Sequence, residues 1–177
     1  MVETIKYEVL REIGNLEIRR YPKIVIAKVE DPANGFNLLY RFITGENREK
    51  AKVKMTTPVV SQQIQMTSPV FSETGEMAFV MPAEYTLETT PEPLDKRVKI
   101  VEIPARLIAV LCFSGGWSEA HFEKETLELL KTLAEAKIKT KGNVFTMLYN
   151  PPFIPGFLRR NVVAIEVEYT GNKTEIP

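Results

Sequence analysis

The chain has little of what disulfide frameworks and metal centres need. Among its 177 residues there is one cysteine, Cys112, and one histidine, His121. A single cysteine cannot form an internal disulfide, and one cysteine with one histidine cannot build a zinc site of the usual type. Cys112 lies in the apolar run 107–113, which is typical of a small buried residue rather than of a reactive thiolate or haem ligand.

Net charge and long apolar runs are also absent. Lys and Arg total 23, as do Asp and Glu, so the formal net charge is zero, which argues against a general electrostatic grip on nucleic acid. The longest apolar run is the seven residues 107–113, whereas a membrane helix needs about 20. The N-terminus has no apolar signal core. We therefore expect a cytoplasmic monomer that has no transmembrane segment and binds no nucleic acid.

Catalytic motifs are missing as well. No nucleophile motif of the Ser-His-Asp type is recognisable, and Gly115-Gly116 is too short for a phosphate loop. His121 falls on the polar arc of its predicted helix, which indicates a solvent-exposed side chain rather than a catalytic base or an iron ligand. The sequence therefore predicts no enzyme, no catalytic residue and no metal ligand.

Apolar periodicity predicts an α+β fold. Hydrophobic residues make up 44% of the chain, enough for the core of one domain spanning 1–177. A first helix is predicted to begin at Asp31-Pro32, with Asp as N-cap and Pro at the first helical position, and to end near Gly45. Strands are predicted from Leu16 to Val29 with a break at Pro22, between 52 and 81, at 98–103, 107–113, 144–149 and 162–169, with a loop at 82–95 and a second helix at 118–136.

Two segments of the sequence repeat. The run 18–27, with Pro22 at its centre, aligns with 100–109, with Pro104 at its centre, at a constant offset of 82 residues. Each run leads through a turn into a helix and then into further strands. We interpret this as a duplication with halves at about 16–81 and 98–169 that closes into one distorted barrel. The alternative is two strand pairs that merely share a proline turn.

The two predicted helices differ in their apolar surface. Around the first helix the apolar arc covers about 200°, about twice what one sheet-facing side needs. The second helix has an ordinary apolar stripe and a charged face. Surplus apolar surface on the first helix indicates a ligand, a partner or a covering loop.

The Pro-rich loop 150–160 is a candidate for that cover or for a second wall of a ligand site. It holds three prolines, which stiffen it, and its apolar side chains are costly to leave in water. These side chains are Phe153, Ile154, Phe157 and Leu158. Packing of the loop on the helix, without any ligand, explains the same pattern.

Several short motifs, in their order along the chain, resemble those of the SOUL/haem-binding protein family. The resemblance covers about residues 5–170. Each motif alone is weak, and together they are specific. They are Met55-Thr-Thr-Pro-Val59, Met66-Thr-Ser-Pro-Val70, Phe79-Val-Met-Pro82, Tyr85-Thr-Leu-Glu88, Pro91-Glu-Pro93, Phe113-Ser-Gly-Gly-Trp117, and Tyr149-Asn-Pro-Pro152 with Phe157-Leu-Arg-Arg-Asn161.

The resemblance implies a distorted β-barrel of two pseudo-symmetric halves flanked by two helices. It also implies that haem or a related tetrapyrrole binds in an apolar groove between the first helix and the loop before the last strand. From the contexts of His121 and Cys112 we expect no strong iron ligand. Arg41 is the basic residue of the helix that can meet a propionate. The other residues that the resemblance and the apolar pattern assign to the groove are Phe36, Leu39, Tyr40, Ile43, Phe153, Ile154 and Phe157.

Two other functions fit the same sequence. GyrI-like effector-binding modules share the duplicated fold and bind amphipathic cations around a buried carboxylate. A buried glutamate without a partner would favour that interpretation. The second alternative is a protein-docking module that uses the apolar helix and loop as its interaction surface.

Overall fold

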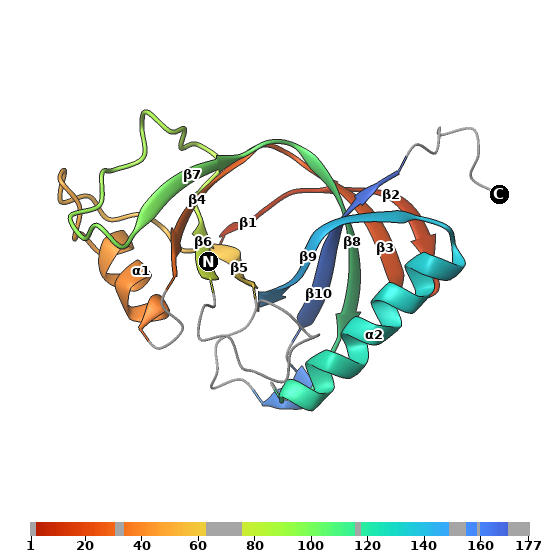
Figure 1. The fold of residues 1–177 in the computed structure, drawn as a ribbon. Coiled ribbons are helices and arrows are strands. Elements are labelled where there is room, and N and C mark those ends of the chain that lie inside the picture. The colour runs from red at the N-terminus through yellow and green to blue at the C-terminus, as the bar shows by residue number, and fades with distance from the viewer. Residues whose placement is uncertain are drawn as a thin grey trace. The chain divides into compact units, whose positions relative to one another are not determined.

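The computed structural model describes residues 3–30, 34–62, 76–115, 118–148, 155–158 and 160–169. The chain divides into two compact units, of which the first comprises residues 1–5 and 22–105 and the second residues 6–21 and 106–177. Within the described residues, each unit contains one mainly antiparallel sheet and one α-helix (Figure 1).

The first unit builds its sheet in the order β5-β6-β4-β7, with β1 added parallel to β5. Helix α1 packs on β4 and β6 (Figure 1). Leu38, Leu39, Phe42 and Ile43 of the helix form one core cluster with strand residues such as Val25 and Phe79. The elements are β1 (Glu3–Thr4), β4 (Ile24–Val29), α1 (Gly35–Ile43), β5 (Thr56–Gln62), β6 (Glu76–Val80) and β7 (Lys99–Ile103).

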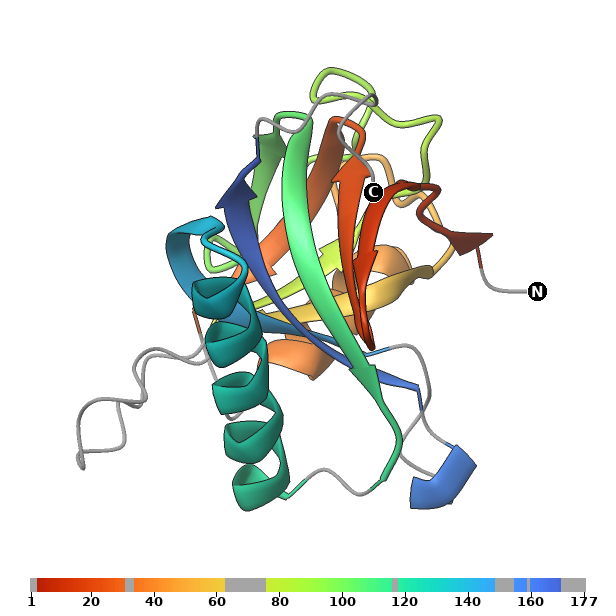
Figure 2. The same ribbon diagram turned by 90° about the vertical axis from the view of Figure 1, so that its right-hand side faces the viewer.

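The second unit builds its sheet in the order β2-β3-β8-β10-β9. Helix α2 lies along one face of this sheet (Figure 2), where its Leu129 and Leu133 pack on apolar residues of β3, β8 and β10. The elements are β2 (Glu8–Ile13), β3 (Leu16–Tyr21), β8 (Arg106–Phe113), α2 (Glu119–Glu135), β9 (Lys139–Leu148), the 3₁₀ helix η1 (Gly156–Leu158) and β10 (Asn161–Glu168).

The predicted α+β class is confirmed, but the predicted single barrel is not found. Within each unit the described strands form an open, mainly antiparallel sheet, and no closed barrel is present among them. Period-two alternation in a sequence shows which face of a strand is buried. It does not show which strand lies next to which, and that pairing decides between a barrel and two sheets.

The compact units do not coincide with the contiguous halves 16–81 and 98–169. Strand β3 lies before β4 in the sequence but pairs with β8 in the second unit, whereas β7, from the later half, pairs with β4 in the first unit. Each unit therefore takes one strand from the other half of the chain.

The registers of these two exchanged pairings are equivalent. Tyr21 lies opposite Arg106 in the β3–β8 pair, and Ile24 lies opposite Ile103 in the β4–β7 pair. Adding the repeat offset of 82 to position 21 gives position 103, and subtracting it from position 106 gives position 24. The Tyr21–Arg106 pair and the Ile103–Ile24 pair are therefore equivalent in the repeat. The order β5-β6-β4-β7 also matches β9-β10-β8-β3 element by element. These observations support the duplication, which stays a prediction, as does the assignment of 1–177 to a single domain.

Element bounds agree with the sequence in part. Strand β4 and helix α2 lie where they were predicted, and Ser118 caps α2 by accepting a hydrogen bond from the His121 backbone N–H. Helix α1 begins at Gly35 with Asn34 as N-cap, not at Pro32, while Asp31 and Pro32 lie outside the described residues. Strand β2 was not predicted, and β9 begins five residues before the predicted 144.

Candidate functional site

Two aromatic side chains form an exposed face on α1. Phe36 and Tyr40, one helical turn apart, are 45% and 50% exposed. Their rings stack at a centroid distance of 6.1 Å and an interplanar angle of 10°. Phe36 also meets the buried ring of Phe79 edge-on at 5.3 Å. This pair, the aromatic face, is therefore held on the core of the first unit while much of both rings remains in solvent.

The wide apolar arc of the first helix divides into a buried part and this exposed part. Leu39 and Ile43, both predicted to line a groove, are 0% and 3% exposed and belong to the core cluster of the first unit. They therefore support the helix on the sheet and do not present surface to a ligand in this structure. Helical periodicity alone could not separate the two parts, because it shows which residues share a face and not which neighbour covers them.

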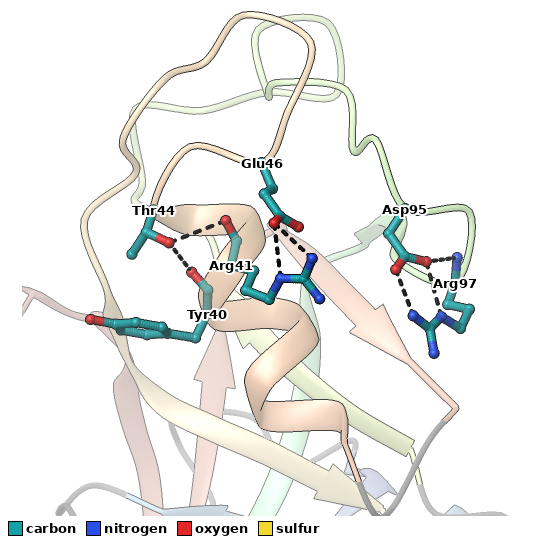
Figure 3. Close-up of polar contacts among 6 residues, drawn as sticks. All are labelled: Tyr40, Arg41, Thr44, Glu46, Asp95 and Arg97. Carbon is teal, nitrogen blue, oxygen red and sulfur yellow. Dashed lines mark hydrogen bonds and ion pairs between the residues drawn. The ribbon is translucent and has the colours of Figure 1, made fainter.

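Arg41 is exposed at the end of α1 and is held by Glu46. Its Nε donates to Glu46 Oε1 at 2.9 Å, and its Nη2 lies 2.8 Å from the same oxygen. Figure 3 shows a second ion pair nearby, in which Asp95 accepts from the Arg97 Nη2 at 2.8 Å and Nε at 3.0 Å. Tyr40 projects away from the Arg41–Glu46 pair in this view.

The hydrogen bonds of Arg97 lower the pKa of the Asp95 carboxyl group. The side chain and the backbone N–H of Arg97 both donate to the Asp95 carboxylate. Together with the more distant charge of Arg41, they hold the pKa of Asp95 at about 2, against an ordinary value of 3.8. The group is therefore an anion at every physiological pH.

Asn47 fixes the segment that follows α1. Its side chain is fully buried, donates to the carbonyls of Phe42 and Ala51 at 3.0 and 2.8 Å, and accepts from the Ala51 N–H at 2.8 Å. One amide thus satisfies a helix carbonyl and both polar groups of a loop residue. This anchor sets where Glu46, its neighbour, can lie.

The Pro-rich loop contributes little to the described structure. Phe153 and Ile154 lie outside the described residues. Phe157 lies in η1 of the second unit, where it is 76% exposed. The predicted role of all three in a ligand site stays a prediction.

A buried arginine in the second unit was missed by the sequence analysis. Arg19 is 1% exposed and points to the face of β3 opposite α2. Its Nε donates to Glu17 at 2.7 Å and its Nη1 donates to the Tyr21 hydroxyl at 2.9 Å, while its guanidinium lies 4.0 Å from the centre of the Tyr7 ring. Its Nη2 lies 3.6 Å from the Cys112 sulfur.

These contacts outweigh the cost of burying the charge of Arg19. Burial lowers the pKa of the guanidinium, but the hydrogen bonds to Tyr21 and Glu17 raise it above its usual value. Arginine is therefore a permanent cation in this cluster. The only sequence signal was the opposite charge of Glu17 on the same strand face, and that pattern is equally typical of a solvated surface.

His121 is less exposed than predicted. Its ring packs on Phe113 with centroids 4.8 Å apart, and its Nε2 lies 3.7 Å from a Glu125 carboxylate oxygen. The side chain keeps 28% of its surface in solvent. The helical wheel was misleading because the loop before α2 brings Gly115 against the imidazole.

The described part of the chain holds no cluster of three or more His, Cys, Asp or Glu side chains that could bind a metal ion. Its buried polar side chains include no carboxylate. None of its helices is long and apolar enough to cross a membrane.

Comparison with known sequences identifies relatives. A family model described as SOUL heme-binding protein matches residues 2–166. Heme-binding protein 2 of Homo sapiens is 31% identical over 148 residues, which cover 78% of this chain and 72% of the human protein.

Comparison with solved structures shows a shared fold. The C-terminal domain of EcmrR matches with a TM-score of 0.61 at 8% identity, over 93% of this chain and 99% of that one. A hydrolase of Listeria innocua matches with a TM-score of 0.59 at 13% identity, over 87% and 92% of the two chains. At these identities the likeness concerns the fold and not the function.

Proposed function

We propose that this chain, which belongs to the SOUL heme-binding protein family, binds haem or a related tetrapyrrole on the aromatic face of α1. The observation that carries the proposal is the stacked, half-exposed pair Phe36 and Tyr40. Family membership supports ligand binding rather than catalysis, and the human relative carries haem binding in its name.

A tetrapyrrole is a flat, mostly apolar disc, so it needs apolar or aromatic walls on its faces. The rings of Phe36 and Tyr40 supply such a wall, and covering them removes aromatic surface from water. Because Phe36 rests on Phe79 and the helix rests on a packed core, little side-chain freedom is lost when a ligand docks. The role of Phe153, Ile154 and Phe157 of the Pro-rich loop in ligand binding remains a separate prediction, and the contact with α1 does not depend on it.

The proposed binding does not depend on a strong iron ligand. His121 is engaged with Phe113 and Glu125, and Cys112 lies beside Arg19, both within the second unit. Affinity then comes from contacts between the protein and the faces and edge of the tetrapyrrole ring, and not from coordination of the iron. Iron-free protoporphyrin should therefore bind with an affinity comparable to that of haemin, and His121→Ala should leave the Soret maximum of the haemin complex in place.

A haemin titration followed at the Soret band tests the proposal. Phe36→Ala and Tyr40→Ala should each weaken binding by about tenfold, or about 1.4 kcal/mol, since each deletes one ring of the wall. The matched control is Leu87→Ala, which removes another exposed apolar side chain of the first unit. Leu87→Ala should bind like the parent.

Unchanged haemin affinity in the Phe36→Ala and Tyr40→Ala double variant would contradict the proposed site. A protein-docking role for α1 would then be the better explanation. The GyrI-like alternative would be favoured by a buried carboxylate that could meet a cation, and the buried polar side chains of the described residues include none.

A further inference from the structure

Arg41, the predicted partner of a ligand propionate, already has an anion on its N–H donors. Glu46 Oε1 lies 2.9 Å from Nε and 2.8 Å from Nη2 of Arg41. A guanidinium holds a carboxylate most strongly through paired N–H groups. A propionate that approached Arg41 along this edge would therefore have to displace the carboxylate of Glu46 or remain beside it.

The backbone holds Glu46 in this position. Its N–H donates to the Arg41 carbonyl at 2.9 Å, and its own carbonyl accepts from the Leu94 N–H at 3.5 Å. The next residue, Asn47, is the buried anchor of the segment. Since the backbone of Glu46 is ordered in the fold, pairing with Arg41 requires little further ordering beyond the two side chains.

The second ion pair in Figure 3 adds no net positive charge beside Arg41. Asp95 is close enough for the charge of Arg41 to lower its pKa, although the hydrogen bonds from Arg97 are the main cause. Arg97 in turn is paired with Asp95 at 2.8 Å. The four charged side chains among the six residues drawn in Figure 3 thus carry two positive and two negative charges. A ligand carboxylate would meet a neutral group of charges that contains two anions.

We infer that Glu46 determines ligand specificity by disfavouring tetrapyrroles with a free carboxylate at Arg41 and by favouring those whose carboxylates are esterified, amidated or absent. This inference rests on the proposed function. Phe36 and Tyr40 are uncharged and accept both kinds of ligand, so Glu46 acts on the choice between ligands and not on the apolar contact itself.

The test compares protoporphyrin IX with its dimethyl ester, both delivered from the same nonionic micelles and followed by fluorescence. The quantity measured is the ratio of the two dissociation constants. Glu46→Gln should shift this ratio about fivefold toward the free acid, which corresponds to about 1 kcal/mol. The affinity for the ester should stay as in the parent.

Two further variants separate this effect from net charge. Glu92→Gln removes the carboxylate of another exposed ion pair of the first unit, in which Glu92 lies 3.1 Å from Arg48. It makes the same change in net charge and should leave the ratio unchanged. In an Arg41→Gln background, Glu46→Gln should no longer favour the acid, because the cation it would release is gone.

The outcomes distinguish the inference from the proposed function. If both porphyrins bind the parent but Glu46→Gln leaves the ratio unchanged, or shifts it no more than Glu92→Gln does, the role of Glu46 is disproved while tetrapyrrole binding stands. If neither porphyrin binds saturably and neither signal responds to Phe36→Ala, the proposed function fails and the inference fails with it.

Discussion

At the scale of single residues, buried polar groups in this protein are compensated by several partners at once. Arg19 is surrounded by a carboxylate, a hydroxyl, a sulfur and an aromatic ring, and Asn47 uses both ends of its amide. A buried polar group without partners costs more than its hydrogen bonds contribute when they are made. Both residues are therefore expected to matter for stability more than their polarity suggests.

Asn47→Ala should lower the free energy of unfolding by about 2–3 kcal/mol. The change removes three hydrogen bonds and leaves the Phe42 carbonyl and both polar groups of Ala51 without this partner. Urea denaturation measures the loss. Asn37→Ala, on the exposed side of α1, is the control and should change stability by less than about 0.5 kcal/mol. Equal stability of the two variants would contradict the assigned role.

The carboxyl group of Asp95 should titrate near pH 2 in an NMR experiment. Because the pKa is lowered from 3.8 to about 2, the pair stabilises the folded state above pH 3.8 and loses that contribution as the pH falls toward 2. The side chains lie at the surface and salt screens them, so the contribution to stability stays below about 1 kcal/mol. Arg97→Gln should raise the pKa, and an unshifted pKa in that variant would show that the backbone N–H alone sets it.

At the scale of elements, α1 shows how one helix divides its apolar surface between core and solvent. Leu38, Leu39, Phe42 and Ile43 face the sheet, whereas Phe36 and Tyr40 remain half exposed. Helix α2, by contrast, presents one stripe centred on Leu129 and Leu133 to its sheet. The order of elements is the same around both helices, so the exposed aromatic rings are a property of α1 and not of the fold.

Leu39→Ala and Phe36→Ala should therefore have different effects. Leu39→Ala should destabilise the protein by about 2–5 kcal/mol, since it opens a cavity beneath the helix. Phe36→Ala should cost much less in stability and act mainly on ligand affinity. Thermal unfolding and haemin titration of both variants give the comparison. A Leu39→Ala variant that is as stable as the parent would mean that the helix does not pack as described.

At the scale of the whole molecule, each compact unit is completed by a strand from the other half of the chain. Strand β4 pairs with β7 over five residue pairs, and β3 pairs with β8 over six. The loop between Pro82 and Pro93 separates the strands of both pairs in sequence. Neither contiguous half then contains a complete sheet, which is a feature of topology and not of any single residue.

Fragments 1–88 and 89–177 should consequently be unfolded when separate and should fold when mixed. Separation removes the β7 partner of β4 and the β8 partner of β3, and it leaves backbone hydrogen-bonding groups and apolar strand faces uncovered. Circular dichroism of each fragment and of the equimolar mixture measures this. Cooperative unfolding of fragment 1–88 alone would contradict the strand exchange.

The sequence by itself determined part of the local structure, and it determined the family. The proline-centred repeat, the apolar strand 107–113 and the helix predicted at 118–136 depend on neighbours along the chain, and β8 and α2 lie where these signals placed them. The ordered motifs identified the family, whose model matches residues 2–166. The choice of α1 as the element with surplus apolar surface was also a matter of local periodicity.

Only the tertiary structure decided what covers each residue. Leu39 and Phe36 share one apolar arc, and the position of the sheet buries the first and leaves the second in solvent. Arg19 and Glu46 look like ordinary surface charges in the sequence. In the structure Arg19 is buried among its partners, and Glu46 accepts a hydrogen bond from Arg41. Pairing between strands and contacts between loops join residues far apart in the chain, and no local pattern contains that information.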